Sequence, residues 1–326
     1  MNDPLIFARA VHFAATLSVA GVALFQIFIA GPALQASGDH TALRATVRLQ
    51  LTYIAWIALL VCTISGAVWL VIVAQSISGD ELRDVFSQDV LGTVLLRTGF
   101  GQDWIARFVL ALLLAAMLFS FLSPQPTKPI WVSVVAVALA AGLAGSLAWA
   151  GHAVGAEGIE GIIHPAADFV HLVAAAAWVG TLLPLALLFS AARHGIASVA
   201  IARVATVRFS NLGVASVATL LVTGSINAWY LAGSIAALTE TDYGHLLLLK
   251  VALFIGMVAI AAVNRLLLMP RLVQDANATA SAKALRQLRR NTAIEVAMGA
   301  IIIAIVAALG TNPPGFEALT HIHHSH

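Results

Sequence analysis

The sequence predicts an all-α integral membrane protein with about eight transmembrane helices. Of its 326 residues, 60% are hydrophobic and only 10% are charged, and the mean hydropathy is +0.95. These values lie far outside the composition of soluble globular domains. A helix needs about 20 apolar residues to cross the hydrocarbon core. Stretches that meet this need cover roughly residues 5–30, 51–74, 104–122, 130–150, 166–191, 209–232, 246–268 and 293–310.

The connections between these stretches are short. The longest, near residues 75–103 and 269–290, leave no room for a separate soluble domain. No cleavable signal peptide is expected, because the N-terminus lacks a basic region and residues 5–30 are long enough to span the bilayer. Cys62 is the only cysteine, which argues against a disulfide framework and against a thiolate-based metal pump.

Loop charges predict the orientation of the chain. Acidic residues gather in the connections after the second, fourth and sixth stretches, and basic residues gather in the others. Because basic loops stay in the cytoplasm, both termini are expected to be periplasmic. The pI of about 9.0 then reflects anchoring charge, and no nucleic-acid partner is expected. Only Arg83 and Arg97 stand in the acidic loops, and the basic residues of the other loops are Arg44, Arg48, Lys128, Arg193, Arg203, Arg208, Arg271, Lys283, Arg286, Arg289 and Arg290.

The two halves of the chain resemble each other. Corresponding stretches are four apart, so the halves share one orientation, as in parallel repeats. We therefore predict a four-helix repeat over residues 1–150, a second over 151–310, and a His-rich tail over 311–326. The matching segments are Arg9-Ala-Val-His12 with Asp168-Phe-Val-His171, ISGAVWLVIVAQSI (64–77) with VTGSINAWYLAGSI (222–235), and Thr98-Gly-Phe-Gly101 with Thr241-Asp-Tyr-Gly244, followed six residues later by Arg107 and Lys250.

Most histidines fall on the predicted outer side, and only His40 and His194 fall on the other. Imidazole is the commonest protein ligand for borderline metals, and it also ligates haem iron. The asymmetry indicates that a metal or metallocofactor is handled at the outer face. The histidines on this side are His12, His152, His164, His171, His245, His321, His323, His324 and His326.

The densest group lies in residues 151–180. Pro165 suits the first turn of a helix, and spacing then puts His164, Asp168, His171, Ala175 and Trp178 on one face. A carboxylate one turn from a histidine either ligates a metal or orients the imidazole. We expect Asp168 and His171 to form a metal site.

Three other outer histidines are weaker candidates for this site. His152 and His164 either join it or hydrogen-bond water and backbone at the interface, and His245 begins the seventh stretch. A glycine-rich loop before Pro165 leaves His152 free to approach the site.

Ionisable residues inside the bilayer are costly and point to function. His12 corresponds to His171 in the second repeat, and we expect it to be a metal ligand as well, neutral and facing the bundle interior. Arg107 and Lys250 either snorkel outward, compensate acidic residues such as Asp168, or hold anionic cofactor groups. Glu295 is expected to pair with a nearby arginine: Arg265, Arg289 or Arg290.

The tail and the methionines bear on the metal. His321, His323, His324 and His326 form a flexible site suited to Cu(II), Zn or Ni. The methionines are scattered, without a Met-x-x-Met ladder that would suit Cu(I). Imidazole and carboxylate ligands favour Cu(II) at the outer face.

Residues 148–184 and 208–272 resemble the copper-resistance protein D (CopD) family. This resemblance implies a bacterial inner-membrane protein that handles copper in uptake or tolerance and works with periplasmic copper-binding proteins. One departure is the loose entry to the last stretch, RQLRRNTAIEV (286–296). The matching residues are Gly151-His152-Ala153, Asp168-Phe-Val-His171, Trp178-Val-Gly180, Arg208-Phe-Ser210, Thr223-Gly-Ser-Ile-Asn227-Ala-Trp229, Thr241-Asp-Tyr-Gly244, Lys250, Asn264-Arg265 and Pro270-Arg-Leu272.

Three functions are compatible with these residues. The first is a copper transporter without ATP-binding motif or enzymatic activity, passive or coupled to an ion gradient. The second is a haem b oxidoreductase or assembly factor, similar to small bacterial protoporphyrinogen oxidases, with His12 and His171 as axial ligands and Arg107 or Lys250 near the propionates. The third is a sensor or scaffold for the periplasmic copper chaperone.

Overall fold

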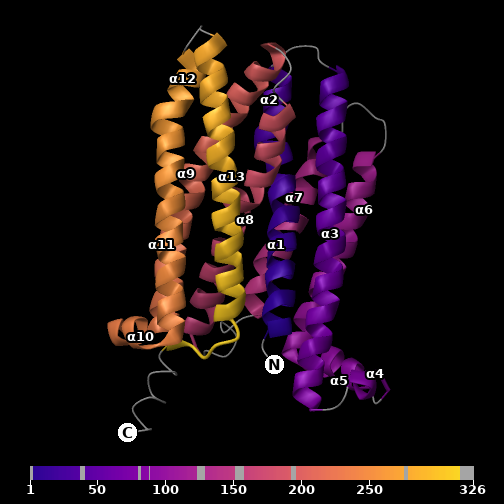
Figure 1. Cartoon of the computed structure of the whole chain (residues 1–326). Helices are drawn as coiled ribbons and strands as arrows, with labels where there is room; N and C mark the ends of the chain where they lie inside the picture. Colours follow the sequence, from indigo (N-terminus) through magenta and orange to yellow (C-terminus); the bar gives the residue numbers. More distant parts are fainter. Residues whose placement is uncertain are drawn as a thin grey trace.

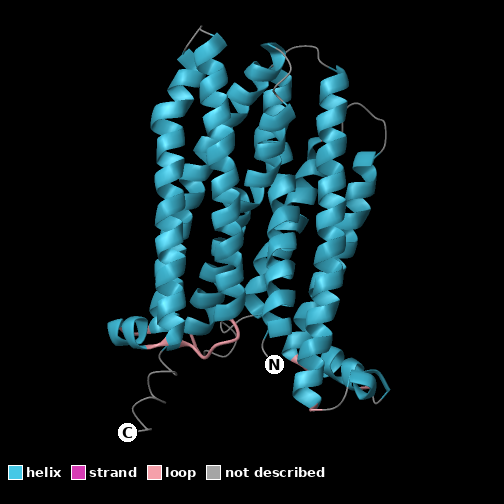
Figure 2. Cartoon of the chain, viewed as in Figure 1, coloured by secondary structure: helices cyan, strands magenta, loops and turns pink. Residues whose placement is uncertain are grey.

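The computed structural model describes residues 3–36, 41–79, 82–87, 89–122, 129–150, 158–191, 196–274 and 278–315. Every regular element in these ranges is helical (Figure 2). The helices are α1 (Asp3–Phe25), α2 (Gly31–Ala36), α3 (Thr41–Ser78), α4 (Leu82–Ser87), α5 (Val90–Arg97), α6 (Gly99–Leu122), α7 (Ile130–Gly145), α8 (Glu160–Ala191), α9 (Ile196–Ala232), α10 (Ile235–Glu240), α11 (Asp242–Val263), α12 (Met269–Gln274) and α13 (Ala278–Leu309).

Across the described ranges, eight helical segments are long and apolar enough to cross a membrane, and each overlaps one predicted stretch. All but Ile130–Ala150 are longer than the predicted stretches, because helices such as α9 and α13 continue through polar turns that contain arginines. The segments are Asp3–Gln35, Ala45–Ser78, Gly99–Ser120, Ile130–Ala150, Glu160–Ser190, Ala200–Ala232, Asp242–Leu272 and Ser281–Leu309. The prediction of an all-α membrane protein with eight transmembrane helices is confirmed.

Several of these segments change helical type along their length. π-helical turns at Gln26–Ala30 and Asn264–Leu268 join α1 to α2 and α11 to α12, and a 3₁₀ turn at Ser146–Ala150 continues α7. Such turns often lie at functional sites. Pro165 was expected in the first turn of its helix, but α8 begins at Glu160, so the proline lies in the second turn.

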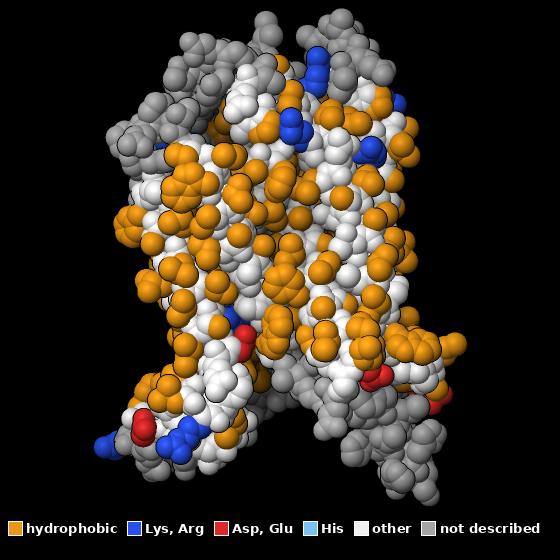
Figure 3. Space-filling view, turned by 180° about the vertical axis from the view of Figure 1, so that it is seen from behind, with side chains coloured by type: hydrophobic (Ala, Val, Ile, Leu, Met, Phe, Trp, Pro, Cys, Tyr) orange, Lys and Arg blue, Asp and Glu red, His pale blue; other side chains and the backbone are white. Residues whose placement is uncertain are grey.

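The long helices stand side by side, and the start of α1 and the end of α13, nearest the two termini, lie at the same end of the bundle (Figure 1). The short helices α4, α5 and α10 also lie at that end. Hydrophobic side chains cover the middle of the molecule (Figure 3), as expected for a surface that faces lipid. On the face shown there, acidic side chains are confined to the part nearer the termini, whereas basic ones occur at both ends.

Corresponding corners of the two halves are built alike. The Thr98 hydroxyl accepts a hydrogen bond from the Gly101 N–H at the start of α6, and Thr241 does the same for Gly244 in α11, both at 3.0 Å. A Cβ on either glycine would collide with the backbone of the short helix before it, α5 or α10. Each corner therefore requires a glycine and a capping threonine at the same spacing.

Helices α1 and α8 pack closely at the centre of the bundle. Gly21 lies against Gly180, and a Cβ on either residue would collide with the backbone of the other helix. Close backbone approach between small residues is a common basis for helix association in membranes. The two glycines are 159 residues apart, like His12 and His171. The contact agrees with a near-twofold relation, while the repeat boundaries at residues 150 and 310 stay a prediction.

Candidate functional site

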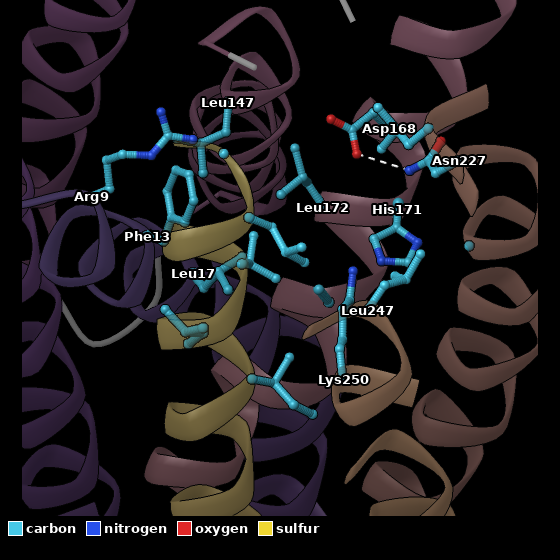
Figure 4. A pocket seen from close by; sticks show the side chains of 18 of the residues that line it. Arg9, Phe13, Leu17, Leu147, Asp168, His171, Leu172, Asn227, Leu247 and Lys250 are labelled. Atoms are coloured by element: carbon cyan, nitrogen blue, oxygen red, sulfur yellow. Dashed lines mark hydrogen bonds between the residues drawn. The ribbon is translucent and has the colours of Figure 1, made fainter. Parts of the chain in front are cut away.

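A cavity of about 200 Å³ lies between α1, α8, α9, α11 and α13 (Figure 4). Apolar side chains make up most of its lining, as is usual for ligand sites. Its polar residues come from four helices and include both charge signs. They are Arg9, His164, Asp168, His171, Asn227, Tyr243 and Lys250.

The hydrogen bonds of His171 fix its tautomer. Its Nδ1 lies 2.9 Å from Thr223 Oγ1, and the Thr223 hydroxyl donates to the Thr219 carbonyl at 2.7 Å. The hydroxyl hydrogen is thus already used, so we assign the proton between the two side chains to Nδ1. Nε2 then carries the lone pair, and no residue in the described ranges hydrogen-bonds to it. His171 therefore presents a free imidazole ligand at the cavity.

Asp168 and Asn227 lie next to this imidazole in the cavity wall (Figure 4). Asn227 Nδ2 donates to Asp168 Oδ1 at 2.9 Å, which orients both side chains. The Asn227 Oδ1 atom is buried and has no partner among the described residues. A buried oxygen without a donor is costly unless a ligand satisfies it. Together the three side chains offer nitrogen and oxygen atoms that suit a cation.

Lys250 extends from α11 into the same cavity (Figure 4). Its charge interacts with Asp168 and with His171. Lys250 thus faces the cavity that contains Asp168, and compensation of Asp168 stays one of the roles predicted for it. Tyr243 is also close enough to Asp168 to interact with its charge.

Arg9 forms the opposite side of the cavity (Figure 4). It is 7% exposed, and its guanidinium stacks over the rings of Trp69 and Phe13 at 4.6 and 5.5 Å. Gly310 leaves the space that the guanidinium occupies. Two cationic side chains and one carboxylate thus share the cavity.

Most of the predicted face of α8 lines the cavity. The residues of this face that line the cavity are His164, Asp168, His171 and Ala175. Trp178 lies outside the lining and packs edge-on against Phe254. His164 is buried and stacks on Tyr230, with ring centroids 5.2 Å apart.

The other histidine candidates lie elsewhere. His245 is exposed, and its Nε2 lies 3.0 Å from the Thr239 carbonyl, so it does not line the cavity. His152, His321, His323, His324 and His326 lie outside the described residues.

His12 belongs to a different cluster. Its Nδ1 donates to the Cys62 carbonyl at 2.9 Å and lies 3.2 Å from Ser65 Oγ. Its Nε2 accepts a hydrogen bond from Arg107, which also donates to Ser146 Oγ at 3.0 Å. Arg107 is 2% exposed, so it does not snorkel. The lone pair of His12 is occupied by a guanidinium, unlike that of His171.

Aromatic rings fill the space around His12. Trp69 and Trp104 are fully buried, and their ring centroids lie 5.6 and 5.2 Å from that of His12. Trp104 also lies under the Arg107 guanidinium, 5.0 Å from its ring centroid. The alignment of the halves matches Trp69 with Asn227 and Trp104 with Leu247. In the C-terminal half, two smaller side chains thus line the cavity where the N-terminal half has two tryptophans.

The two intramembrane histidines therefore do not share a site. His12 bonds to residues of α3 and α6, whereas His171 bonds to α9 and lies near Lys250 of α11. This separation gives no support to the idea that they are the two axial ligands of one haem. Within the ranges described, no three His, Cys, Asp or Glu side chains form a metal-binding group by themselves. A metal in the cavity would thus also use Asn227 or a ligand that it brings.

Four residues of this region were not predicted from the sequence as site residues: Arg9, Thr223, Asn227 and Tyr243. Thr223 aligns with Ser65, and both contact the Nδ1 atom of a histidine. The alignment of the repeats was the signal that would have found it. Asn227 and Tyr243 belong to the matching segments of the repeats, but the sequence did not indicate that they lie near Asp168.

Two family models of copper resistance proteins match the chain. Residues 203–309 match the family model "Copper resistance protein D", and residues 1–162 match "Copper resistance protein D-like, N-terminal domain". The chain is 29% identical over 191 residues to "Copper transport protein CutJ" of Bacillus subtilis (strain 168), which covers 58% of this chain and 35% of that protein. No solved structure matches the chain significantly.

Two relatives match almost end to end. The chain is 31% identical over 315 residues to "Inner membrane protein YebZ" of Escherichia coli (strain K12), covering 95% of this chain and 98% of that protein. It is 30% identical over 324 residues to "Copper resistance protein D" of Pseudomonas syringae pv. tomato, covering 98% and 99%. With eight apolar helices in the part of the chain that the structure describes, it is a multi-pass inner-membrane protein. Identity at this level over nearly the full length of both chains places the protein in the copper resistance protein D family.

Proposed function

We propose that the protein takes up copper ions in the cavity between α8, α9 and α11 and passes them into the membrane-spanning bundle, as a step of copper uptake or tolerance. Membership of a copper-handling family supports the metal, and the relatives' names support copper resistance or transport. The observation that carries the site is the free Nε2 of His171 beside Asp168 and the unpartnered Asn227 oxygen. In this proposal the protein binds and transfers copper without catalysing a reaction.

The chemistry of these ligands favours copper. Imidazole nitrogen together with carboxylate and amide oxygen suits Cu(II) better than a set of thiolates or thioethers would. Thr223 holds the imidazole by its Nδ1–H, the outer hydrogen bond that metal-binding histidines commonly have. Lys250 neutralises Asp168 in the absence of the ion and must withdraw when a cation arrives, since like charges repel.

We infer the direction of transfer from the charges of the loops. The cavity reaches Arg9 and Gly310, near the end of the bundle where both termini lie. The positive-inside rule puts that end in the periplasm. In this orientation a periplasmic copper-binding protein delivers the ion, and His152 and the tail histidines join in its capture. Because the sequence has no ATP-binding motif, an ion gradient or the copper gradient itself drives the step.

Copper titration of the purified protein tests the site. His171→Ala is expected to lower the affinity by more than the roughly 10–100-fold that loss of an outer hydrogen-bond partner costs. His245→Ala is the matched control, because this exposed histidine bonds only to a backbone carbonyl and lies outside the cavity. Equal affinities of the wild type and His171→Ala would overturn the site.

Transport itself is tested with proteoliposomes that contain copper either inside or outside. Movement of copper that depends on His171 supports a transporter, and binding without movement supports a sensor or scaffold. The visible spectrum of the same purified protein examines the haem alternative, which predicts a Soret band that shifts on reduction.

A further inference from the structure

A second polar group lies just beyond the inner end of the cavity. Gly299 of α13 belongs to the cavity lining, and Glu295 lies one turn earlier on the same helix. One turn corresponds to about 6 Å along the axis at 1.5 Å per residue. Glu295 is 0% exposed and lies midway along the last membrane-spanning segment, farther from the termini than the cavity residues of α13.

The partners of Glu295 are neutral. Asn264 Nδ2 donates to its Oε2 at 3.3 Å, and Asn291 Nδ2 in turn donates to Asn264 Oδ1 at 2.7 Å. Its Oε1 is buried and has no partner in the part of the chain that the structure describes. The expected ion pair with a nearby arginine is wrong for Arg265, which donates instead to Ser210 at 2.7 Å and Asn211 at 3.1 Å.

A carboxylate in this position has to be neutralised. Burial of an unpaired charge in a low-dielectric medium is among the most costly changes that a protein makes. Neutral amides stabilise a carboxylate by far less than a cation does. Glu295 therefore holds either a proton or a cation that comes from elsewhere. Its unpartnered Oε1 is the atom that would take it.

Apolar side chains pack at this end of the cavity, on the side of Glu295. Val179 Cγ1 fills the notch at Gly299, because a Cβ there would lie 2.8 Å from it. Met257 is fully buried in the cluster beside Trp178, and Met298 packs against that cluster with its Cε next to Gly256. The methionines look scattered in the sequence, but the fold brings these two together. In the proposal that follows, rotamer changes of these side chains open the way from the cavity to Glu295.

We propose that Glu295, held by Asn264 and Asn291, is a second cation station that carries a proton at rest and exchanges it for the copper ion leaving the cavity. The proposal rests on the proposed copper transfer and extends it by an inner step. The carboxylic acid releases its proton toward the side away from the termini as the copper ion binds the carboxylate. Either the proton or the copper ion therefore neutralises the Glu295 carboxylate at every stage. The π-helical turn that begins at Asn264 is the flexible point of this station.

Reaction with dicyclohexylcarbodiimide tests the resting state, because this apolar reagent modifies protonated carboxyl groups inside membranes. We expect mass spectrometry of the intact protein in native membranes to find the adduct on Glu295. Exposed Glu240 is the internal control and is expected to stay unmodified. Glu295→Gln should lose the adduct and still fold, since glutamine has the shape and neutrality of the protonated acid. An unmodified Glu295 would overturn the proposal, whatever copper does at His171.

The exchange is tested by adding copper before the reagent. Copper is expected to protect Glu295 from the reagent in the wild type. In His171→Ala, copper is expected to give no such protection. In proteoliposomes, Glu295→Gln should bind copper as tightly as the wild type and lose copper movement. If the wild type binds copper through His171 but Glu295→Gln moves it at the normal rate, the inner station is refuted and the cavity site stands. If the wild type binds no copper, the proposed function itself fails.

Discussion

The His12 cluster and the His171 cluster are built on matching positions of the two halves, yet they differ in what the imidazole can do. Both histidines place Nδ1 against a hydroxyl of the next long helix, Ser65 or Thr223. Both have a basic residue six positions after a corner glycine. In the first cluster that residue is Arg107, which occupies the histidine lone pair. In the second it is Lys250, and the lone pair stays free.

Two kinds of substitution explain this difference. Arginine presents a rigid planar fork that can satisfy His12 and Ser146 at once, whereas lysine presents one mobile ammonium group. Trp69 and Trp104 fill the first cluster, whereas Asn227 and Leu247 leave room at the matching positions of the second. The N-terminal half thus packs its histidine among rings and hydrogen bonds, whereas in our proposal the C-terminal half uses its histidine for binding.

The largest expected effect distinguishes a filled cluster from a hollow one. Trp104→Ala removes a fully buried ring that contacts His12, Trp69 and Arg107, so it should destabilise the protein by roughly 3–5 kcal/mol. Leu247→Ala enlarges an existing cavity and should cost about 2 kcal/mol or less, at the low end of such substitutions. Thermal unfolding in detergent measures both. Equal losses of stability would contradict the contrast in packing.

The next effect converts one cluster toward the other. Lys250→Arg puts a guanidinium beside His171, as Arg107 stands beside His12, and should occupy the Nε2 lone pair. A copper ion then has to displace a hydrogen bond to a charged group, worth about 1.5–3 kcal/mol, which corresponds to roughly a 10–150-fold loss of affinity. Isothermal titration with copper measures it.

Lys250→Gln is the matched control for that change. It removes the cation without supplying a fork and should bind copper at least as tightly as the wild type. An unchanged copper affinity of Lys250→Arg would mean that a guanidinium on the Nε2 lone pair does not explain the difference between His12 and His171.

Much of this architecture could be predicted from the sequence. The apolar stretches gave every membrane-spanning helix, because a helix in lipid must satisfy its backbone internally and therefore shows as a long apolar run. Helical spacing put His164, Asp168, His171 and Ala175 on one face, and these residues do line the cavity. Short-range regularities of this kind depend on residues close in sequence.

The chemistry of each histidine depended on contacts between distant helices, and the sequence alone did not predict it. Whether a lone pair is free is decided by Arg107, 95 residues from His12. The Asp168–Asn227 bond and the meeting of Met257 with Met298 are likewise contacts between separate helices. For this reason His12 ranked beside His171 as a ligand before the fold was known.

The smallest effect concerns the hydroxyls that orient the two imidazoles. Thr223→Val keeps the shape of the side chain but removes the oxygen that accepts the Nδ1–H of His171, so the ring can turn or change tautomer. Outer partners of this kind contribute about 10–100-fold to metal affinity, and we expect a loss near the lower end because Gly224 packs against the ring.

Ser65→Ala is the corresponding change in the first cluster, and it should leave copper affinity unchanged. The Nδ1–H of His12 keeps the Cys62 carbonyl as an acceptor, and its Nε2 remains bound to Arg107. Copper titration measures the copper affinity of each variant, and thermal unfolding shows whether each variant is folded. A loss in Ser65→Ala as large as in Thr223→Val would mean that His12 also serves copper, and the division of labour between the halves would have to be abandoned.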